Sequence, residues 1–76
     1  MGGRADVIGL VGSLVTPTRG DRGPGEVAVR VTGGSETFFA WSPEPLAAGR
    51  AVLVVGDRGD AHVDVVAWVD LPGSRP

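Results

Sequence analysis

The sequence predicts an all-β fold: a small barrel of five antiparallel strands without a substantial helix. Valine alternates with polar or small residues in most apolar runs, and glycine and proline separate these runs. The chain has 76 residues, 42% of them apolar, which is enough for one compact core. We therefore expect a single domain at residues 7–70, with flexible tails at 1–6 and 71–76.

The first strand is expected at Val7–Val15, where Gly9 and Gly12 interrupt the apolar run. Glycine within a strand often marks the sharp coiling that a small barrel needs to close. The segment that follows, Thr16–Gly25, is rich in glycine and proline towards its end. It is predicted to be an exposed loop.

A hairpin is predicted to join the second strand, Glu26–Thr32, to the third, Glu36–Trp41. With Gly33-Gly34 as the two loop residues, Val29 faces Phe38. Opposed residues share a face and faces alternate along each strand, so the same parity can be followed through the later strands. The predicted core is Val27, Val29, Val31, Phe38, Ala40, Val52, Val54, Val63 and Val65.

The last two strands are expected at Arg50–Val55 and Ala61–Val69, joined by a turn at Gly56–Asp60. Before them, Pro43 and Gly49 bracket a short link. Many oligonucleotide/oligosaccharide-binding (OB) barrels carry a helix at this point, so the predicted architecture is an OB-like barrel without that helix.

Charge and composition exclude several classes of function. The net charge is -2 and the pI is about 5.1, so no broad attraction to nucleic acid or anionic lipid is expected. No run approaches the ~20 apolar residues that span a bilayer, and no signal peptide is evident. There is no cysteine and hence no disulfide. We expect a cytoplasmic protein that a partner can recruit to a membrane.

Glycine, aromatic and valine residues recur along the chain in a defined order. They are Gly9, Gly12, Phe38, Ala40, Gly49, Val52, Val54, Val63 and Val65. This order and spacing resemble the soluble C-terminal domain of the NfeD-like family. Two features depart from the family pattern: Pro24 directly precedes Gly25 in a lengthened first loop, and the outward positions Phe39, Trp41 and Leu53 are apolar.

The resemblance implies an OB-type barrel and a cellular context. NfeD-like proteins usually carry transmembrane helices before this domain, so this chain is either a short stand-alone member or an excised fragment. They are paired with membrane scaffold proteins of the stomatin, prohibitin or flotillin type, which the resemblance implies as partners.

No group of residues predicts catalysis, a cofactor or a metal site. His62 is expected to be an ordinary surface residue, because no serine or cysteine nucleophile stands out as its partner. Asp57, Asp60 and Asp64 lack the spacing and the closing glutamate of a calcium loop. We therefore expect a protein that is not an enzyme.

Large apolar side chains are predicted on the outer face of the barrel. Phe39, Trp41, Leu53 and Trp68 fall opposite the valine core and are the candidate protein-interaction residues. The other interpretation is that these aromatic residues cover the ends of the barrel, or that a β-bulge reverses the direction of their side chains.

The favoured function is a non-catalytic protein-interaction module that binds or regulates a scaffold protein of the type named above, or a second copy of this chain. The alternative is a nucleic-acid-binding OB protein, since exposed aromatic rings can stack on bases. Against it, seven arginines stand beside nine acidic residues, so nucleic acid is not the expected partner.

Overall fold

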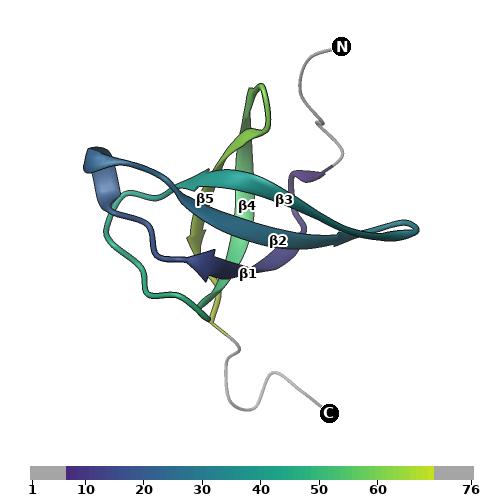
Figure 1. Ribbon diagram of the computed structural model, residues 1–76, viewed down its shortest axis with the longest axis horizontal. Helices are drawn as coiled ribbons and strands as arrows, with labels where there is room; N and C mark the ends of the chain where they lie inside the picture. The colour runs from purple at the N-terminus through teal and green to yellow at the C-terminus, as the bar shows by residue number, and fades with distance from the viewer. Residues whose placement is uncertain (1–6, 70–76) are drawn as a thin grey trace.

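The structure is a computed structural model that describes residues 7–69, and in it five strands form a closed barrel (Figure 1). The order around the barrel is β1-β2-β3-β5-β4. The elements are β1 (Val11–Thr16), a 3₁₀ turn η2 (Gly20–Arg22), β2 (Gly25–Val31), β3 (Gly34–Trp41), β4 (Ala51–Gly59) and β5 (His62–Ala67). The predicted fold class, a five-stranded OB-like barrel, is confirmed. The predicted tails, 1–6 and 71–76, lie outside the described residues.

One pair of neighbouring strands is parallel, which corrects the expectation of antiparallel pairing throughout. β3 pairs with β5 in parallel through Phe39 with His62, Ala40 with Val63 and Trp41 with Asp64. The reason is geometric: strand directions cannot alternate all the way around a closed ring of five. We call this pairing the β3–β5 seam.

The β2–β3 hairpin has a different register from the predicted one. Val31 pairs with Gly34 and Val27 with Phe38, so the loop residues are Thr32-Gly33 and Val29 does not face Phe38. Gly33 supplies the positive φ of the turn, 87°, and Gly34 already belongs to the strand. The shift amounts to two residues on β3, so every side chain keeps its predicted face.

The core is the predicted valine face with additions at its ends. All the expected core residues are buried except Val31, which is only partly covered near the end of β2. Sequence parity missed three further core residues, which lie at the start of the chain, in β1 and in the 42–50 link: Val7, Leu14 and Leu46.

The first strand is shorter than predicted, because Gly9 has a φ of 94° and the strand begins only at Val11. Gly12 lies where β1 runs close beside β2, opposite Val29. A Cβ atom at Gly12 would come within 2.7 Å of the Ala28 carbonyl oxygen and of Val27 Cγ2. The glycine is therefore required for the close approach of the two strands, a role more specific than the barrel coiling that was predicted for it.

The β4–β5 hairpin is longer than expected. β4 continues through residues 56–59, which were predicted to be a turn, and the pairing with β5 accommodates two irregularities, at 54/56 and 57/59. The turn is formed instead by Asp60 and Ala61, with φ of 55° and 66°. Because the strand is extended in this way, Arg58 lies over β5.

The loop between β1 and β2 is anchored and not simply exposed. Thr18 and Ser42 are buried, and the Thr18 hydroxyl donates to Ser42 Oγ at 2.6 Å. Ser42 Oγ donates to the Glu44 carbonyl at 2.6 Å, and the Leu46 amide donates to Thr18 Oγ1 at 2.8 Å. These bonds hold the chain after β3 against the η2 loop, so it turns away from β5 beyond Trp41.

Candidate protein-interaction surface

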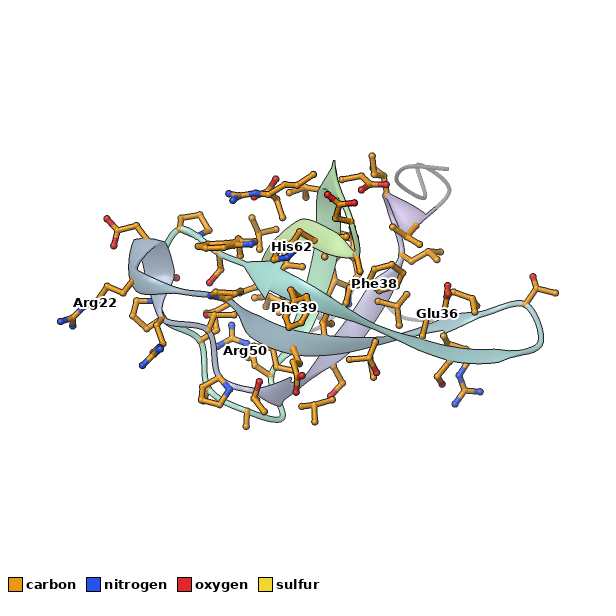
Figure 2. All side chains as sticks on the ribbon, turned by 45° about the horizontal axis from the view of Figure 1, so that its top comes forward. Arg22, Glu36, Phe38, Phe39, Arg50 and His62 are labelled. Atoms are coloured by element: carbon orange, nitrogen blue, oxygen red, sulfur yellow. The ribbon has the colours of Figure 1, made fainter. Side chains whose placement is uncertain are left out.

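Three rings gather on the outside of the β3–β5 seam. The Phe39 ring stacks on the His62 ring, with centroids 4.8 Å apart and planes at 26° (Figure 2). Trp41 Nε1 donates a hydrogen bond to His62 Nδ1 at 2.9 Å. We call Phe39, Trp41 and His62 the aromatic cluster. The parallel pairing creates it, because it brings Phe39 opposite His62.

The hydrogen bond indicates which ring nitrogen of His62 is the acceptor. Indole N–H is only a donor, so Nδ1 must be an acceptor and the proton of the neutral imidazole is on Nε2. The imidazole therefore fixes the tilt of the Trp41 ring and supports the Phe39 ring on its face. The three rings are thus in contact with one another on the outside of the barrel, through one hydrogen bond and two ring contacts.

Arg58 extends the cluster on the side of β4. Its guanidinium carbon lies 4.6 Å from the centroid of the Trp41 ring, a cation–π arrangement. Its Nη2 and Nε atoms lie 2.8 and 2.9 Å from Asp64 Oδ1. With side chains 48% and 39% exposed, this ion pair adds little stability and mainly orients Arg58 over the indole.

A hollow of about 300 Å³ opens beside Trp41, on the outer surface between β3, β4 and the η2 loop. We call it the groove. Its apolar lining comes from Trp41, Pro43, Val55 and Val66, and its charged residues are Asp21, Arg58 and Asp64. Val55 is 46% exposed although it is a large aliphatic residue.

The structure brings together two of the four candidate residues. Phe39, 43% exposed, and the partly buried Trp41 share the aromatic cluster. Leu53 instead pairs with Val66 and Val11 on the β1–β4–β5 side. Trp68, also 43% exposed, follows β5, and its amide donates to the Ala51 carbonyl.

Phe39 and Trp41 lie on the outside of the β3–β5 seam and not inside the barrel. At the end where β3 finishes, the buried residues are Leu46, Thr18 and Ser42, while Trp41 projects outward from the seam. For Trp41, this placement differs from that of a side chain that covers the end of the barrel.

His62, Arg58 and Asp64 are the members of this surface that sequence reasoning missed. His62 was expected to be an isolated surface residue, and Arg58 was assigned to a turn. The signal that could have found His62 is the parallel seam, because it places His62 beside Phe39 and Trp41. Antiparallel pairing alone could not predict that neighbourhood.

The geometry offers no proton relay among residues 7–69. His62 Nδ1 is bonded to an indole, and Ser42 Oγ is bonded to Thr18 and to a backbone carbonyl. Within the same range, no three side chains of the metal-binding types come together, and no helix is long and apolar enough to cross a membrane.

Comparison with known proteins identifies the family. No curated protein and no solved structure matches the chain at a significant level. The model of the NfeD C-terminal domain, however, matches residues 11–66, a range that begins with β1 and takes in nearly all of β5. The chain therefore belongs to the NfeD family, through a C-terminal domain that forms this five-stranded barrel.

Proposed function

We propose that the barrel is a non-catalytic protein-interaction module whose contact surface is the aromatic cluster together with the groove. The observation that carries the proposal is the Phe39–His62–Trp41 arrangement, in which an exposed ring and two partly buried rings contact one another outside the core. Preorganised aromatic side chains are the residues that most often dominate binding energy at protein interfaces.

The proposed partner is a membrane scaffold protein of the stomatin, prohibitin or flotillin type, as the family resemblance implies. In this proposal the domain acts in the cytoplasm and reaches the membrane through that partner. The alternative partner for the same surface is a second copy of this chain.

One observation favours a second function, the binding of single-stranded nucleic acid. The cluster presents flat rings on an OB-type barrel, with Arg58 above one of them. The charges nearby oppose it, because Asp21 and Asp64 line the groove and Glu26 pairs with Phe39. The protein-interaction function is therefore the better supported.

The test is direct binding between the purified chain and the purified soluble part of a stomatin-type protein from the same genome, by calorimetry. Trp41→Ser should weaken binding by about thirtyfold, because one aromatic anchor can contribute ≥2 kcal/mol. The melting temperature should fall only modestly, since Trp41 is outside the valine core.

Trp68→Ser is the matched control, because Trp68 is an exposed tryptophan outside the cluster. Equal losses for the two variants, or a large loss of stability in Trp41→Ser with unchanged binding, would contradict the proposal. A titration with oligo-dT at low salt, followed by tryptophan fluorescence, tests the second function. Size-exclusion chromatography of Trp41→Ser and the parent tests self-association.

A further inference from the structure

The groove exists because β3 leaves the barrel wall before β5 ends. The pairing of the two strands stops at Trp41 with Asp64, while β5 continues to Ala67. Beyond Trp41 the chain is drawn towards the η2 loop by the bond between Ser42 and Thr18. The Trp41 indole and the exposed Val55 both line the open space.

The size of the groove limits what it can hold. Pockets for small molecules range over ~300–1,000 Å³, and this one, about 300 Å³, lies at the lower limit. It has room for one or two side chains of a partner. Its apolar walls favour an aliphatic side chain, because burying one gains ~1.5–3 kcal/mol relative to leaving it in water.

The charges around the groove are not balanced. Asp64 is neutralised by Arg58, with which it forms the ion pair described above. Asp21 is exposed on the η2 side, and among residues 7–69 no ion pair to its carboxylate is found. Among the charged residues that line the groove, Asp21 is therefore the one whose charge is not balanced by an ion pair within residues 7–69.

We propose that the groove receives a short segment of the partner that inserts an aliphatic side chain between Trp41 and Val55 and places an adjacent Lys or Arg against Asp21. The proposal rests on the proposed function and specifies the chemistry of the partner. An acidic or purely polar segment would lack either the charge or the apolar anchor.

The probes are three synthetic eight-residue peptides that differ only at four central positions. The first carries leucine and isoleucine flanked by two arginines, the second replaces the arginines by glutamates, and the third replaces the aliphatic residues by serines. Each is titrated into ¹⁵N-labelled protein. The first should bind at least about tenfold more tightly than the others, and it should shift the Trp41 indole signal and the amides of Val55 and Val66.

Two variants test the two halves of the proposal. Val55→Glu should abolish binding of the first peptide, and its control is Val15→Glu, an exposed valine (55%) outside the groove lining. Asp21→Arg should weaken binding of the arginine peptide and strengthen binding of the glutamate peptide, so that the preference between the two is reversed. Its control is Glu44→Arg, because Glu44 is exposed and does not line the groove.

Equal affinities for the three peptides, shifts centred outside the groove, or no shift at millimolar peptide would overturn the proposal. The two proposals can also fail separately. If Trp41→Ser abolishes binding of the scaffold protein but Val55→Glu and Asp21→Arg do not, the groove proposal is wrong and the proposed interaction surface still holds. If the scaffold protein does not bind but the peptide preference reverses as expected, the groove proposal holds and the proposed partner is wrong.

Discussion

The two faces of β3 contrast sharply, although their residues alternate along one strand. Phe38 and Ala40 point into the barrel and are buried, while Phe39 is exposed and Trp41 is half-buried on the outside. The inward pair contacts a valine core that the hydrophobic alternation alone predicts. The outward pair depends on β5, a strand that the sequence did not predict as its neighbour. Alternation fixes the side on which a residue lies, and topology decides which residues it meets there.

The largest loss of stability is expected for substitutions on the inward face of the barrel wall. Phe38→Ala should cost ~3–5 kcal/mol, because it removes a buried aromatic ring, and this is comparable to the whole stability of a small domain. Val29→Asp should also unfold the barrel, since it places a carboxylate at a fully buried position. Thermal melts followed by circular dichroism measure both, with the exposed Thr37→Ala as control. Parent-like melting of the two core variants would refute the assignment of faces.

An intermediate effect is expected for Trp41→Phe on the outward face. The variant keeps an aromatic ring but removes the N–H donor to His62 Nδ1, so we expect a loss of ~0.5–1.5 kcal/mol of unfolding free energy. Because the bond is only partly buried, the lower half of this range is the more consistent with solvent access. Chemical denaturation measures the loss. Trp68→Phe makes the same chemical change outside the cluster and should be neutral; equal costs at both positions would refute the role assigned to the hydrogen bond.

The smallest effect is expected for Arg58→Ala. Its ion pair with Asp64 is well exposed and its contact with Trp41 lies at the surface, so the loss should be below ~1 kcal/mol and should shrink as salt is added. Denaturation at low and high salt, with Arg30→Ala as an exposed control, measures it. A loss as large as that of Phe38→Ala would mean that Arg58 supports the core, and the contrast between the two faces would not hold.

The same contrast explains which features of the fold could be predicted from the sequence. The core positions from Val27 to Val65 were correct because an error of two residues in register leaves every face unchanged, and the hairpin contains such an error. The parallel seam was missed because no local pattern distinguishes a parallel neighbour from an antiparallel one. Residues 56–59 were predicted to be a turn, because glycine and aspartate are common turn residues. They instead continue β4 with irregular pairing, which places Arg58 over Trp41.

The alternation of faces along each strand placed all four candidate contact residues outside the core, but it could not show which of them are neighbours. Phe39 and Trp41 meet through His62, whereas Leu53 and Trp68 are associated with β1 and β4. The groove was not predictable, because it depends on where β3 turns away and on the buried hydroxyl pair of Thr18 and Ser42.

The parallel seam also has a consequence for how the chain folds. Local hairpins join β2 to β3 and β4 to β5, but the ring closes only when β3 meets β5 and when Val11 meets Leu53, more than half the chain away. Contacts between distant segments carry a large loop-closure entropy and slow the folding of barrels to milliseconds or longer. Trp41 lies in one of these two long-range strand pairings, so the fluorescence of its indole should report closure of the ring. In a Trp68→Phe background, stopped-flow fluorescence would follow the moment at which the two hairpins become one barrel.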